Sequence, residues 1–403
     1  MTDTAPSPFG PLLEEARELQ SAAVQVRRDL HLRPEIGLQL PRTQERILAA
    51  LDGLALQVRT GEQVSSVVAV LDGGRPGPTM VLRGDMDALP MPEDTGLGYA
   101  SEVDNAMHAC GHDTHVAMLA GAAKLLSDRR DELAGRVLFM FQPGEEGYHG
   151  ARYMLEEGML DGVGEVTRAF ALHITTAAPT GTVNLRGGTM MASSDTMRIR
   201  VIGRGGHASA PHNALDPIPI ACEIVQALQI MITRQVDVFD PAVVTVARIT
   251  AGTTSNVIPE HADILGTIRA VSERTRSLVH DAIKRVAEGI AAAHSAEARV
   301  EVELGYPVTV NDMGYAGTVL DTATQLLGEH RVNAMRSPIM GAEDFSYVLQ
   351  RVPGALAFLG ACPPGLDPRT AAPNHSNRVV FDEAAMSTGI ATYAAMALQH
   401  LAG

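Results

Sequence analysis

The chain has 403 residues, of which 32 are basic and 47 acidic, and its net charge at neutral pH is −15. A surface this acidic repels nucleic acid and anionic membranes, so neither is expected as a partner. No apolar run reaches the roughly 18 residues that span a bilayer, and Met1–Ala5 lacks the pattern of a leader peptide. Three cysteines give no disulfide framework, which favours a cytoplasmic protein. The length predicts two domains, or one large domain with an insertion.

The first part of the chain alternates helix and strand patterns. Apolar periodicity predicts helices over 13–32 and 113–127, and strands over 64–71, 79–83, 136–141 and 167–172. Continuous apolar strands separated by helices indicate a sheet covered on both faces. Because open α/β sheets bind ligands at the carboxyl ends of their strands, we expect the polar residues that follow these strands to meet at one edge.

From Ser193 the pattern changes to strand 195–203, helix 214–235, strands 242–250 and 262–271, helix 273–293 and strand 298–304. This β-α-β-β-α-β order is the ferredoxin-like signature. After Pro307 the earlier alternation resumes with segments 314–328, 345–350, 355–360 and 381–401. The sequence thus predicts an α/β domain with a mainly parallel sheet, built from residues 1–192 and 307–403. It is interrupted by an α+β domain at 193–306.

The segment His108–His115 packs three imidazoles and a thiol into eight residues, and Glu145 and Glu146 follow the strand at 136–141. Imidazole, thiolate and carboxylate are the ligands that a zinc-like cation prefers, and a hydrolytic site also needs an unligated carboxylate to accept a proton from water. Adjacent side chains in extended backbone point opposite ways, so one glutamate can face the metal and the other the water. The pattern predicts a metal site with its general base, rather than core or solvated histidines.

Roles inside this segment stay open at this point. Cys110 and His112 project to one side if the backbone is extended, and His112 and His115 share a face if a helix starts at Asp113. His115 therefore cannot be ranked below His112 as a ligand. Asp113 is a plausible N-cap of that helix.

Two aspartates, Asp85 and Asp87, follow the strand at 79–83, where each could bind a metal, orient a metal-binding histidine or serve only as a turn residue. His173 directly ends the strand at 167–172, and His375 lies in a polar loop near the C-terminus. These histidines matter because a site for two cations needs about five or six protein ligands.

The inserted domain offers further candidates. The glycine-rich turn Gly203–Ser209 carries His207 but lacks the residues of a phosphate-binding loop, so it predicts either a tight turn with a solvent-facing histidine or a functional group. Asn256 and Arg269 offer an amide and a guanidinium suited to a substrate carboxylate. A serine nucleophile is not expected because no Gly-x-Ser-x-Gly elbow occurs.

Six motifs in chain order carry a resemblance: RGDMDALP at 83–90, HACGHD at 108–113, QPGEE at 142–146, GGHAS at 205–209, SNVIP at 255–259 and GAEDF at 341–345. Together they resemble the amidohydrolase branch of the dinuclear-metal aminoacylase and carboxypeptidase superfamily. That branch includes hippurate hydrolases, N-acyl-amino-acid amidohydrolases and hydrolases of auxin conjugates. The match runs from about residue 29 to residue 380.

The resemblance implies a catalytic domain interrupted by a lid that also dimerises. It implies five metal ligands: Cys110 bridging two cations, His112 and His173 completing one site, and Glu146 and His375 completing the other. Glu145 would be the general acid/base and Asp87 the partner of the metal cluster. In relatives the histidine matching His207 reaches the neighbouring subunit's active site and stabilises the oxyanion, and Asn256 and Arg269 match positions that contact the substrate carboxylate. A homodimer is therefore expected, with a tetramer as the alternative.

We therefore expect an enzyme that hydrolyses the amide bond of N-acyl amino acids or related small amides with a metal-activated water. A dipeptidase or an N-acyl-diaminopimelate deacylase is the alternative within the enzyme class, and a non-catalytic metal- or ligand-binding sensor is the alternative outside it. Mixed nitrogen, oxygen and sulfur ligation suits two zinc ions, with manganese or cobalt as chemical alternatives. The small, polar segment after His173 departs from the family pattern and leaves the acyl specificity open.

Overall fold

The computed structural model describes residues 9–402, so Met1–Ala5 lies outside the described residues. The chain forms two compact units. The first comprises Met1–Met190, Val310–Ser337 and Asp344–Gly403, and the second comprises Met191–Thr309 and Pro338–Glu343. Within the described residues, no helix combines the length and the apolar character that crossing a membrane requires.

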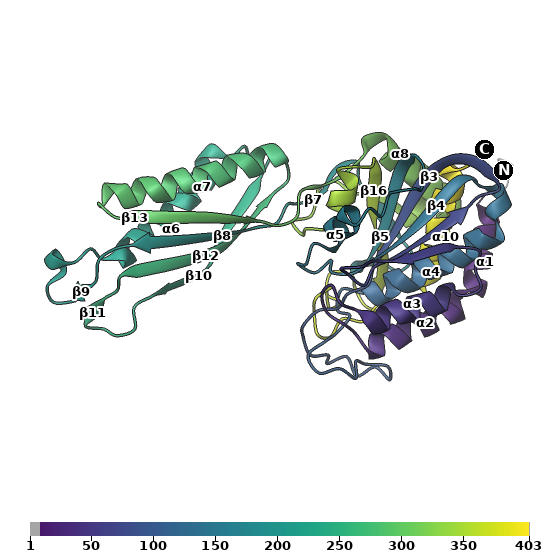
Figure 1. Cartoon of the computed structure of the whole chain (residues 1–403), viewed down its shortest axis with the longest axis horizontal. Helices are drawn as coiled ribbons and strands as arrows, with labels where there is room; N and C mark the ends of the chain where they lie inside the picture. The colour runs from purple at the N-terminus through teal and green to yellow at the C-terminus, as the bar shows by residue number, and fades with distance from the viewer. Residues whose placement is uncertain (1–8, 403) are drawn as a thin grey trace. The chain divides into compact units, whose positions relative to one another are not determined.

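The first unit is built on an eight-stranded sheet (Figure 1). In spatial order its strands are β1 (Gln57–Thr60), β2 (Val67–Asp72), β4 (Ala134–Gln142), β3 (Arg75–Asp85), β5 (Val166–Pro179), β16 (Gly354–Cys362), β6 (Val183–Leu185) and β15 (Val332–Ala334). The four central strands β4, β3, β5 and β16 run parallel, and antiparallel pairs flank them. The predicted mainly parallel sheet is confirmed.

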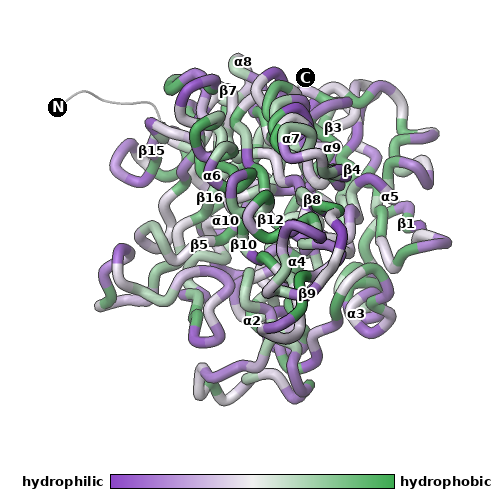
Figure 2. Tube along the Cα trace, turned by 90° about the vertical axis from the view of Figure 1, so that its left-hand side faces the viewer, coloured by the Kyte–Doolittle hydropathy of each residue, from purple (hydrophilic) through white to green (hydrophobic). Residues whose placement is uncertain are grey.

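Helices cover this sheet: α1 (Gly10–Glu18), α2 (Gln20–Leu32), α3 (Pro41–Leu51), α4 (His112–Asp128), α5 (Gly150–Glu156), α8 (Met313–Leu327), α9 (Ser346–Leu349) and α10 (Ala385–His400). Short 3-10 turns lie at Arg130–Glu132 and Glu329–Arg331. Helix α4 packs against β3 and β5, and α10 against β5 and β16. All nine residues of β16 are buried, and its apolar residues are among those coloured green in Figure 2. The predicted helix over 13–32 is interrupted at Leu19 and forms two helices.

The second unit has a four-stranded antiparallel sheet in the order β10-β12-β8-β13. Its elements in chain order are β8 (Asp195–Ile202), α6 (Pro217–Gln235), β10 (Ala242–Ala251), β12 (His261–Ala270), α7 (Glu273–Ala293) and β13 (Glu297–Leu304). The predicted ferredoxin-like order is confirmed. A smaller sheet pairs β9 (Gly206–His207) with β11 (Val257–Ile258), and Pro211–Asn213 forms a 3-10 turn. Strands β7 (Gly188–Met191) and β14 (Thr309–Asn311) form another pair.

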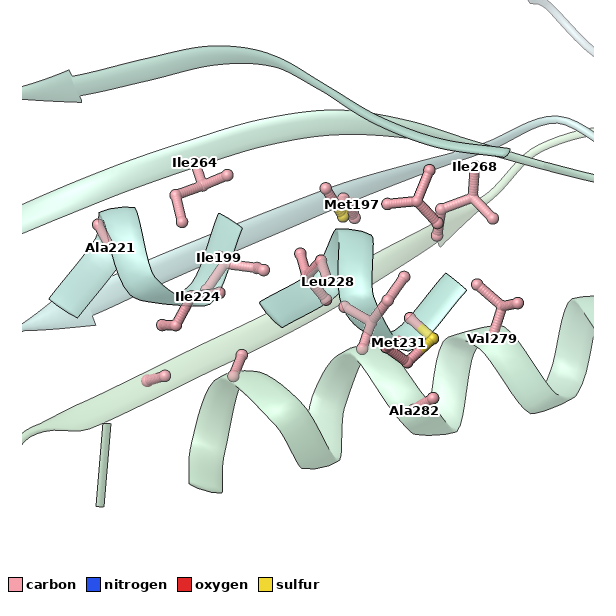
Figure 3. Packing of buried hydrophobic residues seen from close by; sticks show 14 of the residues in the cluster. Met197, Ile199, Ala221, Ile224, Leu228, Met231, Ile264, Ile268, Val279 and Ala282 are labelled. Atoms are coloured by element: carbon pink, nitrogen blue, oxygen red, sulfur yellow. The ribbon is translucent and has the colours of Figure 1, made fainter. Parts of the chain in front are cut away.

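Alternation along β8 explains the core of the second unit. Met197, Ile199 and Val201 are buried, whereas Arg198 and Arg200 between them are exposed, because successive side chains of a strand face opposite sides. Figure 3 shows the buried face of the sheet packed against apolar residues of α6 and α7, among them Ile224, Leu228, Met231, Val279 and Ala282. Both helices thus lie on one face of the sheet, and the other face stays open.

Helix α6 begins at Pro217 rather than at 214 as predicted. The side chain of Asp216 caps the helix by accepting a hydrogen bond from the backbone N–H of Ile218, and proline is favoured in the first helical turn because it has no N–H to lose. This local chemistry moves the start of the helix to residue 217.

Candidate metal centre

Polar residues gather at the carboxyl ends of the central strands of the first unit. Strand β3 ends at Asp85 and β4 ends at Gln142, shortly before Glu145 and Glu146. His173 was expected to end its strand, but β5 continues to Pro179. The reason is that β5 pairs with β16 up to Pro179, whereas its pairing with β3 stops at Ala171. His173 therefore lies just beyond the edge that β3 and β4 define.

The argument from spacing assumed an extended backbone at Cys110 and His112. The structure instead has a sharp turn there. Gly111 has φ 87°, in the left-handed region that favours glycine, and it caps helix α4, which begins at His112. A Cβ on Gly111 would lie 2.4 Å from Ile174 Cγ2 and 3.0 Å from the ring of Phe381, so a larger residue would clash here as well as strain the backbone. The sharp turn, rather than strand alternation, brings Cys110 and His112 together.

Asp113 does not cap this helix, which corrects one of the roles left open above. Its fully buried carboxylate accepts hydrogen bonds from Arg27 Nε at 3.0 Å and pairs with His31 Nδ1 at 2.8 Å. These contacts tie the first turn of α4 to α2. The Asp113 carboxylate therefore supports the fold around the ligand turn.

Two groups of three ligand-type residues share the thiol of Cys110. One is Cys110 with His112 and His173, the other Cys110 with Glu146 and His375, and within each group the ligand atoms lie within 4.8 Å of one another. Cys110 Sγ lies 3.4 Å from His173 Nε2 and 3.3 Å from His375 Nε2. Atoms bound to one cation at about 2.0–2.3 Å lie roughly 3–4 Å apart. The spacing therefore fits two adjacent cations with one thiolate between them.

The hydrogen bonds of two histidines prepare their Nε2 atoms for a metal. His112 Nδ1 lies 2.9 Å from the backbone oxygen of Asp87, and His173 Nδ1 lies 2.8 Å from that of Ile174. A carbonyl oxygen can only accept, so Nδ1 carries a proton in both rings, and Nε2 is the nitrogen that can bind a cation once it is deprotonated. His112 Nε2 is buried and has no hydrogen-bond partner among the described residues. The Nε2 atoms of His112 and His173 are therefore suited to bind a metal ion.

The charges of the ligand groups are strongly coupled. Burial opposes ionisation of Cys110, but the nearby imidazoles of His173 and His112 outweigh it and lower the thiol pKa to about 5. Hydrogen bonds to Cys110 and Glu146 raise the pKa of His375 to about 10. The thiol is thus poised as a thiolate, which is the form that binds a cation.

Asp87 links both glutamates to His112, a candidate metal ligand. Its Oδ1 accepts the backbone N–H of Glu145 at 2.9 Å, and its Oδ2 accepts that of Glu146 at 3.0 Å. Oδ1 also lies 3.4 Å from His112 Nδ1. One buried carboxylate therefore fixes the backbone of the Glu145–Glu146 pair relative to the metal-ligand turn.

His115 has both ring nitrogens engaged. Nδ1 is hydrogen-bonded to Asp85 Oδ1, and Nε2 accepts the backbone N–H of Ile174 at 2.7 Å. Although Asp85, His112 and His115 lie close enough to be considered as a metal group, neither nitrogen of His115 has a lone pair to spare. The structure thus ranks His115 below His112, and His115 holds β5 at Ile174, next to His173.

His375 comes from a loop rather than from a strand end. Its φ of 69° is left-handed, and its backbone N–H donates to Ala109 O at 2.9 Å. The side-chain amide of the preceding Asn374 donates to the backbone oxygens of Cys110 and Ile174 at 3.1 and 3.0 Å. Asn374 was not predicted as a site residue, yet these bonds dock the His375 loop onto the other ligands.

In the second unit, His207 and Asn256 lie side by side. His207 pairs with Val257 across β9 and β11, and the N–H of Ala208 donates to Asn256 O at 3.1 Å. His207 Nδ1 accepts the backbone N–H of Ser209 at 3.1 Å, so a neutral ring carries its proton on Nε2. The exposed His207 therefore presents a hydrogen-bond donor to solvent.

Arg269 lies on β12 of the four-stranded sheet, not on the small β9–β11 sheet beside which Asn256 lies. It is eight positions along β12 from His261, which corresponds to about 26 Å of extended strand, and Asn256 lies before His261 in the chain, next to β11. The half-buried guanidinium donates to Thr267 Oγ1 and to Ile268 O, and burial lowers its pKa. Within one chain, Asn256 and Arg269 therefore cannot hold the same small carboxylate.

Three buried polar residues beneath the site had no predicted role: Arg83, Gln142 and Asp344. They form a connected network, with Arg83 Nε donating to Gln142 Oε1 at 2.9 Å and Gln142 Nε2 donating to Asp344 Oδ1 at 2.6 Å. The position of Arg83 near the end of an apolar strand could have indicated this network from the sequence, because an arginine that is buried there needs a partner for its charge.

The chain is similar over nearly its whole length to curated proteins. A model of peptidase family M20/M25/M40 matches residues 81–399. Thermostable carboxypeptidase 1 of Saccharolobus solfataricus is 38% identical over 96% of this chain and 98% of that protein. N-acetylcysteine deacetylase of Bacillus subtilis is 40% identical over 84% and 87%, and hippurate hydrolase of Campylobacter jejuni is 34% identical over 97% and 99%.

Solved structures agree. The YXEP protein of Bacillus subtilis, described as a dinuclear metal binding peptidase from the M20 family, matches with a TM-score of 0.81 at 34% identity, over 96% of this chain and 99% of that one. An aminohydrolase structure from Staphylococcus aureus matches with a TM-score of 0.90 at 30% identity, over 97% and 99%. The resemblance drawn from the motifs is thus confirmed: the chain belongs to peptidase family M20/M25/M40, in its amidohydrolase branch.

Proposed function

We propose that this enzyme hydrolyses the amide bond of N-acyl amino acids, using a water held by two cations and Glu145 as the general base. The observation that carries the proposal is the pair of ligand groups that share the Cys110 thiol. A second support is the pair Glu145–Glu146, of which only Glu146 belongs to those two groups. The activities for which the deacetylase and hippurate hydrolase relatives are named agree with this substrate class.

The proposed ligand set follows the geometry above. Cys110 would be shared by two cations, His112 and His173 would complete one site, and Glu146 and His375 would complete the other. Nitrogen, oxygen and sulfur donors together suit zinc, and manganese or cobalt can take the same ligands. The relative described as dinuclear supports two cations rather than one.

The chemistry divides between the cations and the side chains. Bound cations would polarise the scissile carbonyl and lower the pKa of a shared water. Glu145 accepts the proton of that water and later donates it to the leaving amine. Asp87 keeps Glu145 in place through its hydrogen bond to the Glu145 N–H, and the Nδ1–H bond of His112 keeps that ring oriented.

The second unit supplies the groups that bind the rest of the substrate. His207, with its proton on Nε2, donates a hydrogen bond to the oxyanion, a role worth around 3 kcal/mol per donor. Asn256, beside the β9–β11 pair, and Arg269, on β12, bind substrate carboxylate groups, but they are too far apart within one chain to act on the same site. A homodimer resolves this separation, because His207 and Asn256 of one subunit can serve the site of its neighbour.

A peptidase that releases a C-terminal amino acid is the second candidate, because the carboxypeptidase relatives match over nearly the full length. Both substrate classes present an amide whose nitrogen belongs to an amino acid with a free carboxylate. They differ on the carbonyl side of the bond: an N-acyl amino acid has a simple acyl group there, whereas a dipeptide has a residue with an α-amino group.

A hydrolysis panel separates the candidates. Metal-free protein is reconstituted with zinc, manganese or cobalt and assayed on N-acetyl and N-benzoyl amino acids, on the matching dipeptides and on an N-acyl-diaminopimelate. The proposal expects kcat/KM for the N-acyl amino acids to exceed that for the dipeptides by at least tenfold with the best metal. Hydrolysis of dipeptides alone would replace the proposal with the peptidase, and no hydrolysis at all would favour a sensor.

A further inference from the structure

The carboxylate of Asp344 holds both ends of the loop that carries Glu145 and Glu146. This loop leaves β4 at Gln142 and enters α5 at Gly150. Asp344 Oδ1 accepts a hydrogen bond from Gln142 Nε2 at 2.6 Å, and Oδ2 accepts the backbone N–H of Ala151 at 2.9 Å. One side chain therefore fixes the point where the loop starts and the point where it finishes.

Asp344 also reaches the proposed base itself. Its backbone N–H donates to Glu145 Oε1 at 3.4 Å. Asp344 is fully buried, so both its carboxylate and its N–H act away from bulk water, where hydrogen bonds hold geometry most firmly. The position of the loop and the direction of the Glu145 carboxylate thus depend on one residue.

A buried cation holds Asp344 in turn. Arg83 Nη2 lies 3.3 Å from Asp344 Oδ1, and Arg83 Nη1 lies 2.7 Å from Asp85 Oδ2. Asp85 is the hydrogen-bond partner of His115, which supports the strand of His173. Arg83 therefore joins the anchor of the base loop to the anchor of a metal-ligand strand.

We propose that Asp344 is a positioning residue that acts through Glu145, an inference that rests on the proposed function. A general base must lie within hydrogen-bond reach of the proton it takes, and a displacement of about 1 Å can cost on the order of 10²-fold in rate. An amide cannot replace the carboxylate here. Three donors converge on it, from Gln142, Arg83 and Ala151, so the NH₂ of an asparagine would face at least one of them.

A double-mutant cycle with Glu145→Gln tests this role. Asp344→Asn should lower kcat roughly 10- to 10²-fold, with KM changed less than about twofold because no substrate contact is removed. In the Glu145→Gln background, where the base is already absent, the same substitution should lower kcat less than about twofold. Metal content per chain should match the wild type in all four proteins.

Equal losses of kcat in both backgrounds, or loss of metal with Asp344→Asn, would overturn the proposal. If Asp344→Asn folds poorly, Gln142→Leu enters the same cycle, because it removes one anchor while Arg83 and Asp344 stay paired, and additivity there overturns the proposal equally. Glu383→Gln is the matched control. It removes a mostly buried carboxylate that pairs with Arg27 and Arg28, so it should lower the melting temperature without lowering kcat.

The cycle also separates this inference from the proposed function. Full activity of Glu145→Gln itself would remove the role of Glu145, and the proposed mechanism would fail. An impaired Glu145→Gln combined with an additive effect of Asp344→Asn would leave that mechanism intact and remove only the positioning role of Asp344.

Discussion

The candidate groups of the two units differ in how they are held. In the first unit, Cys110, His112 and Glu145 are buried and each has hydrogen-bonded neighbours that fix its orientation. In the second unit, His207 and Asn256 are exposed beside the small β9–β11 sheet, and Arg269 lies on β12 of the four-stranded sheet. The comparison teaches that one chain brings the candidate metal ligands together by itself, whereas Asn256 and Arg269 of one chain lie too far apart to bind one small carboxylate.

The largest expected effect falls on the buried side of this comparison. Glu145→Gln should lower kcat by at least 10²-fold, the low end for loss of a general acid/base, and should leave metal content nearly unchanged. Glu146→Gln should lose metal as well, because Glu146 is a proposed ligand. Rate assays combined with metal analysis of both variants check the difference, and equal metal loss in the two would remove the division of roles.

A second prediction addresses the exposed side. His207→Ala should lower kcat about 10²-fold, as loss of one oxyanion donor does. If His207 acts across a two-fold interface, mixing inactive His207→Ala and Glu145→Gln subunits should restore activity, since one site of each heterodimer keeps both groups.

The control for this mixing experiment is each variant mixed with itself. Heterodimers that have formed, as verified by two different affinity tags, but that stay inactive would show that His207 serves its own subunit or no subunit. The distinction between the two units would then need revision.

A third prediction sharpens the assignment of Cys110. The imidazoles of His173 and His112 lower the pKa of the buried thiol to about 5 despite the opposing effect of burial. An alkylating reagent that enters the metal-free site should therefore modify it in the thiolate form, and bound metal should slow the labelling at least tenfold. Mass spectrometry of Cys110 with and without metal measures this ratio, with the exposed Cys222 as the internal control. A ratio near one at both cysteines would contradict the ligand role.

The smallest effect concerns stability on the buried side. His31 lies 2.8 Å from Asp113 and 3.3 Å from Glu93, and although burial and Arg27 oppose protonation, these carboxylates raise its pKa to about 9 from 6.5. Because the pKa of His31 is higher in the folded than in the unfolded state, its protonated ring stabilises the fold. This stabilisation is complete below pH 6.5 and is lost as pH rises through 9. In urea unfolding, the free energy of unfolding of the wild type should fall by about 3 kcal/mol relative to that of His31→Gln between pH 6 and pH 10.

A difference between the two proteins that stays constant over this pH range would show that folding leaves the pKa of His31 unchanged. The comparison with His31→Gln is needed because His375, a proposed metal ligand whose pKa is raised to about 10, also titrates near the upper end of this range. Metal-loaded protein at fixed free-metal concentration keeps the contribution of His375 equal in both samples.

Local patterns predicted most of this architecture. The central strands β3, β4, β5 and β16 are continuous apolar runs, and β8 alternates cleanly, so both kinds of strand carry a strong signal. The four residues of β1 are all exposed and gave no signal. Helix α5, with seven residues, is too short for a periodic pattern.

The chemistry of the site was easier to predict than its geometry. Cys110 and His112 stand out by residue type, but their juxtaposition depends on the left-handed turn at Gly111, which spacing alone does not reveal. His115 could be set aside only once the backbone N–H of Ile174 was seen to occupy its second nitrogen. Contacts between residues far apart in the chain, such as that of Asp344 with Gln142, have no local signature at all.

The number of cations bound per chain tests the central claim most directly. Metal-free wild type, His173→Ala and His375→Ala are each titrated with zinc by calorimetry, and the bound metal is counted after dialysis. Because Cys110 is proposed to bridge two sites that His173 and His375 complete separately, the account predicts two cations for the wild type and one for each variant. A single cation in the wild type, or unchanged binding in both variants, would contradict it.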